Sequence, residues 1–217
     1  MASYFRLTLD TTAPGGVGLV INNGAVNTAS PVVNLAIACT DSDKTGYQMK
    51  IWGIDGAATE SAATWETYSA TKQVTLPTGD GSKTVYVKVR DDVYNESASA
   101  SDTITLDTSV PEVTIQSQDV QKISKISPKN VSTIIWQADV AITEWIIKVV
   151  DSINATHEDG TVVPITGGST NITGTEKAAA TNVTTKIYGA DLETASSGDG
   201  EKILKIFVKN AAGTWSN

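Results

Sequence analysis

An internal repeat divides this chain of 217 residues into two similar halves. The block Leu7-Thr8-Leu9-Asp10-Thr11 recurs as Ile104-Thr105-Leu106-Asp107-Thr108, 107 − 10 = 97 positions later. A second block, Gly79-Asp80-Gly81-Ser82-Lys83, recurs as Gly198-Asp199-Gly200-Glu201-Lys202, where the offset is 198 − 79 = 119. Two copies of roughly 100 residues therefore follow one another, and the second carries about twenty extra residues between these blocks.

Both copies share a strand pattern after the Gly-Asp-Gly block. Apolar residues alternate there with polar or aromatic ones, which is the period of a half-buried β-strand. In the first copy the apolar positions are Val85, Val87 and Val89. In the second copy they are Leu204, Ile206 and Val208. The glycines predict tight turns before these strands, because glycine tolerates positive φ angles.

Copies of this length, with frequent turn residues and no long amphipathic helix, are typical of β-sandwiches. We therefore predict an all-β protein of two tandem immunoglobulin-like (Ig-like) antiparallel β-sandwich domains. Residues 1–10 are assigned to an N-terminal strand or arm, residues 11–107 to domain 1 and residues 108–217 to domain 2.

Two segments of domain 2 and the single cysteine allow further local predictions. Either Ile134-Trp136-Ala138 or Thr133-Ile135-Gln137 faces the core, and a β-bulge would reconcile the two registers. Residues 178–193 can hold a short helix, although residues 183–187 have the pattern of a strand. Cys39 follows Leu35 and Ile37 on the same alternate face, which predicts a buried core thiol.

Charge and the absence of targeting signals exclude several classes of partner. The net charge is −8 and the isoelectric point is near 4.6, so the protein repels phosphates and we expect no nucleic acid partner. The first residues have no apolar core of a secretory signal, and no segment is long enough for a membrane span. We therefore expect no membrane insertion and synthesis in a cytoplasm.

The two Gly-Asp-Gly strand blocks resemble those of bacterial and phage Ig-like repeat domains. The resemblance rests on residues 79–91, on residues 102–108 and on residues 198–213, and it covers both copies. Such domains occur in phage virion proteins (tails, baseplates, capsid decoration) and in adhesins. The resemblance implies the fold directly and implies a structural or adhesive role, because its motifs carry no chemistry.

A search for catalytic motifs predicts that the chain is not an enzyme. It contains no Gly-x-Ser-x-Gly, no phosphate-binding loop and no His/Cys metal spacing, and His157 is its one histidine. We predict no catalytic residues and no cofactor, with calcium as the single candidate. The calcium ligands would be aspartates in predicted loops and linkers, namely Asp10, Asp107, Asp41 and Asp43. The alternative is that these side chains cap backbone N–H groups in turns.

Aromatic residues allow a second kind of site. Trp65 and Tyr68 are candidates for a surface that binds a glycan on a host cell, while tryptophans that close the ends of a small sandwich core are the alternative.

The two ends of the repeat do not match. Copy 1 ends with a predicted strand over residues 101–107, whereas copy 2 stops at Asn217 before the corresponding strand. Residues 3–10 resemble that strand, with Leu7 and Leu9 in the positions of Ile104 and Leu106. An apolar strand of this kind, with Phe5, Leu7 and Leu9 on one face, suits pairing to an open sheet edge.

Donor-strand exchange is one explanation: the N-terminal strand of one subunit completes domain 2 of the next. The strand can also extend a sheet of domain 1, fold back within its own chain, or dock on another virion protein. The expected function is a non-enzymatic structural protein of a phage virion (capsid decoration, neck, tail or baseplate), with itself or other virion proteins as partners. The alternative is an adhesin-type module that binds a surface glycan or protein.

Overall fold

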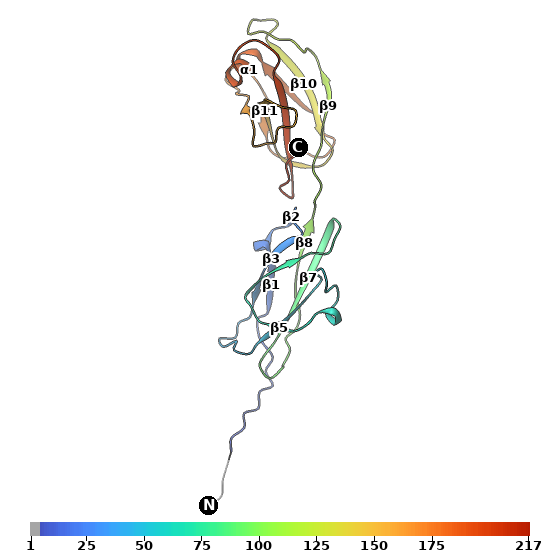
Figure 1. Ribbon diagram of the computed structural model, residues 1–217, viewed down its shortest axis with the longest axis vertical. Helices are drawn as coiled ribbons and strands as arrows, with labels where there is room; N and C mark the ends of the chain where they lie inside the picture. The colour runs from blue at the N-terminus through green and yellow to red at the C-terminus, as the bar shows by residue number, and fades with distance from the viewer. Residues whose placement is uncertain (1–4) are drawn as a thin grey trace, which may run out of the picture. The chain divides into compact units, whose positions relative to one another are not determined.

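The computed structural model describes residues 5–217, in which the chain forms two compact units (Figure 1). The first unit ends at Thr108 and the second runs from Ser109 to Asn217. Both are built of short strands that pair almost entirely antiparallel, and each pair of sheets encloses apolar side chains. The predicted all-β fold of two tandem Ig-like sandwiches is confirmed.

The first unit packs a three-stranded sheet against a five-stranded sheet. The smaller sheet has the order β1 (Gly18–Ile21), β3 (Val32–Ala38), β6 (Thr71–Thr75). The larger has the order β2 (Asn27–Thr28), β8 (Ala100–Leu106), β7 (Gly81–Arg90), β4 (Gln48–Trp52), β5 (Glu66–Thr67). Pairing is antiparallel except between β2 and β8. Single 3₁₀ turns lie at Asn22–Gly24 and Glu60–Ala62.

The core of the first unit is one continuous cluster of buried apolar side chains. Strand β3 buries alternate residues, as its period of two predicts, and β7 does the same from Val85 onward. Strand β8 completes the cluster with Ile104 and Leu106, which are 0% and 2% exposed.

The second unit also has two sheets. One has the order β14 (Val183–Tyr188), β10 (Val131–Ala138), β9 (Val113–Gln118). In the other, β11 (Ile142–Val150) pairs on one side with β12 (Thr161–Val162) and β13 (Thr173–Gly174), and separately with β15 (Ile203–Asn210). A short helix α1 (Gly189–Ala195) follows β14. Within residues 5–217 no helix is long and apolar enough to cross a membrane.

Buried apolar side chains of the second unit form three separate clusters in place of one. The first contains Trp136 and Trp145, whose rings meet edge to face with centroids 5.8 Å apart. The third contains Phe207 and Ala155, the latter from the segment between β11 and β12. The second cluster contains Ile147 and Ile187, and Leu204 packs against it. Because Phe207 and Leu204 of β15 pack against different clusters, both faces of this strand are covered in part.

The structure tests three local predictions: the register around Trp136, the short helix within residues 178–193 and the burial of Cys39. Trp136 and Ala138 face the core, and the expected bulge lies between Ile135 and Trp136, where the register to β9 shifts. Residues 183–187 lie in a strand, as their pattern predicts, and the short helix occupies only the end of the predicted stretch, beginning at Gly189. Cys39 lies just beyond β3 and is half-buried, because the strand ends before its side chain reaches the core.

Candidate functional site

A hairpin after the long strand of the first unit is held by two polar side chains. The carboxylate of Asp91 accepts the N–H groups of Val93 and Asn95 at 3.0 and 2.8 Å. Ser97 then pairs with Val89: its N–H donates to the Val89 carbonyl at 2.8 Å, and its hydroxyl accepts the Val89 N–H at 3.0 Å. After this hairpin the chain enters β8, which pairs along β7.

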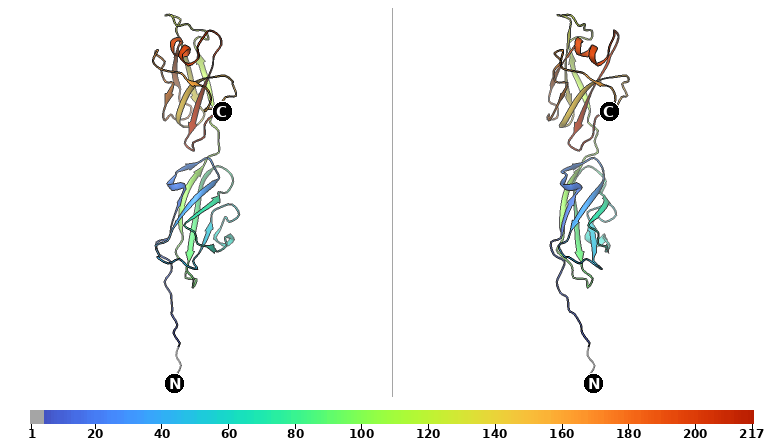
Figure 2. Two further views of the ribbon diagram at one scale, coloured as in Figure 1. Left: turned by 60° about the vertical axis from the view of Figure 1, so that its left-hand side comes forward. Right: turned by 90° about the vertical axis from the view of Figure 1, so that its left-hand side faces the viewer.

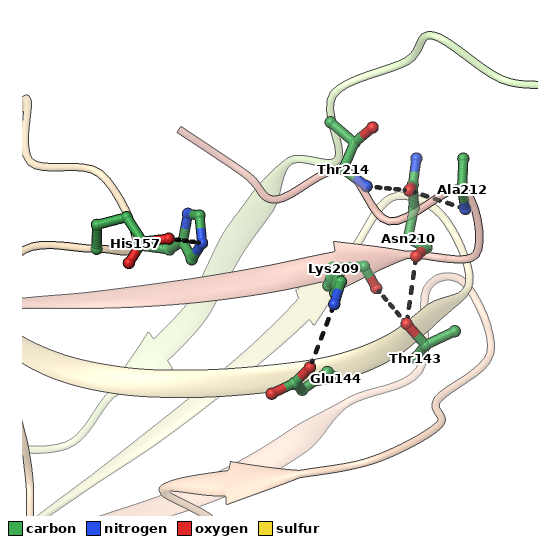
Figure 3. Close-up of polar contacts among 8 residues, drawn as sticks. Thr143, Glu144, His157, Lys209, Asn210, Ala212 and Thr214 are labelled. Carbon is green, nitrogen blue, oxygen red and sulfur yellow. Dashed lines mark hydrogen bonds and ion pairs between the residues drawn. The ribbon is translucent and has the colours of Figure 1, made fainter. Parts of the chain in front are cut away.

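The second unit repeats this hairpin at an offset of 210 − 91 = 119 positions (Figure 3). The amide oxygen of Asn210 accepts the N–H groups of Ala212 and Thr214 at 3.1 and 2.9 Å. Ser216 pairs with Val208 as Ser97 pairs with Val89, with distances of 2.8 and 3.1 Å. The Asn/Ser hairpin of β15 is therefore the equivalent of the Asp/Ser hairpin of β7.

Beyond the hairpin the two units differ. In the first, β8 lies along the outer edge of β7 from Gly81 to Val87. In the second, among residues 5–217, the one strand paired with β15 is β11, apart from the single bridge between Lys209 and Trp215. Strand β15 is thus an edge strand at the place where β7 is an inner strand.

The difference in pairing changes the burial of equivalent side chains. Val85 and Val87 are 0% exposed, whereas their counterparts Leu204 and Ile206 are only partly buried. The strand on the other side of the opening, β9, is exposed along almost its whole length, and Ile115 is 51% exposed. The sandwich of the second unit is therefore open between β9 and β15.

A groove of about 920 Å³ lies at this opening. Its apolar lining includes Ile134, Ile187, Leu192 and Leu204, and its rim includes the turn around Asp199. The groove is lined by side chains from four elements, β10, β14, α1 and β15. Its volume is that of a typical small-ligand site, and one of its sides is the edge of strand β15, with polar backbone groups along it.

The N-terminal segment is the other apolar feature. Phe5, Leu7 and Leu9 are 88%, 88% and 85% exposed, and residues 5–15 belong to no strand or helix. Both views of Figure 2 show this segment running away from the sheets of the first unit. The expected strand over residues 3–10 is therefore absent from residues 5–10, since no strand of the described chain pairs with them; the Asp10 carbonyl accepts the side-chain amide of Asn95, at 3.3 Å. Ser3 and Tyr4 lie outside the described residues.

The candidate calcium ligands are not gathered into one site. Asp10 accepts the N–H of Thr12, and Asp43 accepts that of Thr45, which lowers the pKa of Asp43. Asp107 follows β8, where its N–H donates to the Thr28 carbonyl. Within residues 5–217 no group of three or more histidine, cysteine, aspartate or glutamate side chains is arranged to hold a metal ion.

Asp41 has a different environment from the other three aspartates. One of its oxygens accepts the hydroxyl of Tyr47 at 3.0 Å and the other accepts the N–H of Gly15 at 3.3 Å. Burial of the phenol, together with this carboxylate, raises the pKa of Tyr47 to about 12. Asp41 thus ties the start of the first unit to the turn before β4.

Two buried aspartates that the sequence analysis did not single out have structural roles. Burial raises the pKa of Asp191, but hydrogen bonds from Ser169, Gly167 and Thr166 outweigh this and leave the pKa below its usual value. Asp91 behaves likewise, with bonds from Asn95 and Val93. Burial can be predicted for such residues only once their donors are known, since Asp in a turn is more often exposed.

The aromatic candidates Trp65 and Tyr68 have separate surroundings. Tyr68 packs against the core and donates its hydroxyl to the Ile37 carbonyl at 2.9 Å. Trp65 lies under the guanidinium of Arg90, which is 4.3 Å from its ring centroid and 4.3 Å from that of Tyr94. Trp65, Arg90 and Tyr94 therefore form a layered stack. The sequence did not reveal it, because Trp65 lies 90 − 65 = 25 positions before Arg90.

No protein-family model and no curated protein matches this chain. Among solved structures, the fibronectin(III)-like modules of Clostridium thermocellum CbhA are similar with 10% identity and a TM-score of 0.46, over 92% of this chain and 89% of that chain. The FN1–FN3 domains of chicken CNTN1 have 14% identity and a TM-score of 0.41, over 95% of this chain and 62% of that one. A domain of intimin has 12% identity and a TM-score of 0.31, over 93% and 96%. The fold assignment rests on the sheets described above.

Proposed function

We propose that this chain is a non-enzymatic structural protein of a phage virion, a capsid decoration, neck, tail or baseplate component that assembles through its N-terminal segment. The exposure of Phe5, Leu7 and Leu9 carries the proposal. Single exposed apolar residues are common on protein surfaces, but three at alternate positions of one extended segment mark a surface that a partner covers.

The chemistry of the segment supports a protein partner. Its apolar residues alternate with Arg6 and Thr8, so that one face is apolar and the other polar once the segment is extended. Such a face fits a sheet edge or an apolar groove, and the partner is a second copy or another virion protein. The net charge of −8 opposes nucleic acid as the partner.

The virion context is supported by the resemblance of both Gly-Asp-Gly strand blocks to Ig-like repeats of tails, baseplates and capsid decorations. Assembly from repeated Ig-like domains requires no catalytic group, and the buried carboxylates Asp91 and Asp191 serve hairpins and loops of their own units.

Solution mass tests the proposal. Full-length protein is compared by light scattering with a deletion of residues 2–10, with Leu7→Asp and with its matched control Thr8→Asp. Burial of one leucine is worth roughly 1.5–3 kcal/mol, so Leu7→Asp should weaken assembly at least about tenfold, whereas Thr8→Asp should not. Monomers in all four samples, with no peptide of the chain in purified virions by mass spectrometry, would refute it.

An adhesin-type module that binds a host-surface glycan is the second candidate function. The layered stack of Trp65, Arg90 and Tyr94 favours it, because Tyr94 is 65% exposed and offers an aromatic face over a cation. Glycan binding that is lost in Trp65→Ala and kept in Trp215→Ala, an aromatic substitution in the other unit, would support this function. Absence of binding across a glycan array would end it.

A further inference from the structure

Among residues 5–217, no other strand pairs with the outer edge of β15, which leaves backbone groups there unpaired. Ile147 of β11 bonds away from β15, because its N–H donates to the Ile172 carbonyl and its own carbonyl accepts the N–H of Val163. In an antiparallel pair the bonding residues alternate, so Lys205 and Phe207 bond to β11 while Leu204 and Ile206 point their N–H and C=O groups outward. Val208 has the same orientation and bonds outward to Ser216.

The first unit shows which strand such an edge receives. Strand β8 pairs with β7 at Val85↔Asp102, Lys83↔Ile104 and Gly81↔Leu106. In the second unit, the residues equivalent to Val85, Lys83 and Gly81 lie 119 positions later and are Leu204, Lys202 and Gly200. The turns before the two strands have the same geometry: Gly79 and Gly198 both have φ of +85°, and Gly81 and Gly200 have +115° and +129°. The turn before β15 therefore matches the turn that precedes the β8 pairing in the first unit, while residues 200–202, equivalent to the start of β7, belong to no strand.

Residues 5–10 have the sequence of that strand. Leu7-Thr8-Leu9-Asp10-Thr11 corresponds to Ile104-Thr105-Leu106-Asp107-Thr108. We infer that residues 5–10 of a second copy of this chain bind along β15, with Leu9 opposite Gly200, Leu7 opposite Lys202 and Phe5 opposite Leu204. This inference rests on the proposed assembly function and names its acceptor site.

Phe5 is the position at which the sequence of residues 5–10 differs most from that of β8, and the groove explains the difference. In the first unit this position is Asp102, whose carboxylate accepts the N–H of Ile21 from β1 at 2.8 Å. In the second unit the equivalent position faces the groove lined by Ile134, Ile187 and Leu192. An aromatic side chain fills such a hollow, whereas a carboxylate there would lose its hydration.

The linker supports a second copy as the source of the strand. In the first unit, Thr108 donates its N–H and hydroxyl to the Asp80 carboxylate at 3.0 and 2.9 Å, just after β8. The equivalents are Thr11, just after the donor segment, and Asp199, at the rim of the groove. A proline stands four positions after each aspartate, Pro111 after Asp107 and Pro14 after Asp10. The junction between two copies thus reproduces the junction between the two units of one chain, which is the order of a head-to-tail assembly.

Register-specific crosslinking tests the position of the strand. All proteins carry Cys39→Ser. In the first unit Ser82 pairs with Thr105, so Thr8→Cys in one copy should lie against Glu201→Cys in another. Mixing the two single-cysteine proteins under mild oxidation should give a disulfide dimer. The control is Leu9→Cys with Glu201→Cys, because a shift of one residue turns the side chain to the opposite face, and it should react at least about tenfold more slowly.

A self-complemented variant tests the groove itself. Residues 99–108 are appended after Asn217, so that the chain supplies its own strand to β15. We expect this variant to be monomeric, to lose the 8–201 crosslink and to unfold its second unit at higher temperature. Assembly that persists in it would overturn the groove as the acceptor and would leave the proposed function intact.

Two further outcomes would also overturn the inference. A chain carrying both Thr8→Cys and Glu201→Cys that closes into a crosslinked monomer would place the strand within its own chain. Equal rates for the 8–201 and 9–201 pairs would show that the segment binds without the predicted register. If the full-length protein does not associate at all, the inference fails, and the solution mass shows this before any crosslink is made. The proposed function fails with it only if purified virions also contain no peptide of the chain.

Discussion

Equivalent side chains of the two units should respond differently to truncation, because one lies on a strand with a neighbour on each side and the other lies at an open groove. Val85 is 0% exposed on β7, which β8 flanks, so Val85→Ala removes about 1.6 kcal/mol of transfer free energy and leaves a cavity, for a total near 2–3 kcal/mol. Leu204 loses more atoms on truncation to alanine, yet it is only partly buried and no closed cavity results. We expect Leu204→Ala to cost about 1 kcal/mol when the groove is empty.

Filling the groove should change the second value and leave the first unchanged. With residues 99–108 appended after Asn217, Leu204 becomes a core residue and its truncation should cost roughly 3 kcal/mol, within the range for buried leucines. The increase of about 2 kcal/mol corresponds to roughly 8 °C in the unfolding temperature of a unit of about 100 residues.

Scanning calorimetry of the full chain measures these costs, since each substitution identifies the transition of its own unit. Leu204→Ala and Val85→Ala are made both in the deletion of residues 2–10, where the groove is empty, and in the self-complemented variant. Equal costs of Leu204→Ala in the two backgrounds would refute the reasoning, because Leu204 would then not face the added strand. A change in the cost of Val85→Ala would show that the appended strand acts elsewhere.

Three further results are expected from the polar groups. Asp91→Ala should destabilise the first unit by about 2–3 kcal/mol in denaturant unfolding, because buried N–H groups lose their acceptor, while Asp91→Asn should cost less, as Asn210 serves the same hairpin in the second unit. In the folded protein the pKa of Asp191 lies below its usual value of 3.8. Its contribution to stability is therefore full above pH 3.8 and disappears as the pH falls through the folded pKa. The unfolding temperature of the second unit should accordingly fall at acid pH, and Asp191→Asn should make this fall smaller. Calcium at about 2 mM, enough for weak extracellular modules, should leave both unfolding temperatures unchanged, and a calcium shift that Asp107→Asn abolishes would reveal a site.

The fold was predictable from the sequence because its signals are local. Alternation along Val85, Val87 and Val89 defines an inward face, and the paired glycines around Asp80 define the turn that precedes it. The short parallel pairing of β2 with β8 was not predictable, since it depends on where two distant segments meet. The position of the short helix within residues 178–193 was not predictable for the same reason: Ala178 favours helix locally, but the strand over residues 183–188 pairs with β10 and the helix follows it.

The candidate site was predictable in part. The asymmetry of the repeat predicted an unpaired sheet edge in the second unit, and within residues 5–217 β15 is an edge strand. That the second unit lacks a strand stays a prediction. The hairpin signal was also present, as an Asp or Asn followed six residues later by Ser, although only the hydrogen bonds of Asp91 and Asn210 show its meaning. The groove could not be predicted, because α1 and residues 120–126, which follow β9, line it and neither follows from the repeat.

The second unit has buried side chains on both faces of β15, although no other strand among residues 5–217 pairs with its outer edge. Phe207, on the face of β15 that points away from the groove, is 0% exposed and packs with Val150 and Ala155. Trp136 is equally buried and meets Trp145. Neither Phe207 nor Trp136 lines the groove, whereas Leu204 does. A unit with two closed clusters and one open cluster can fold first and bind a strand later, which is the property that an acceptor in stepwise assembly requires.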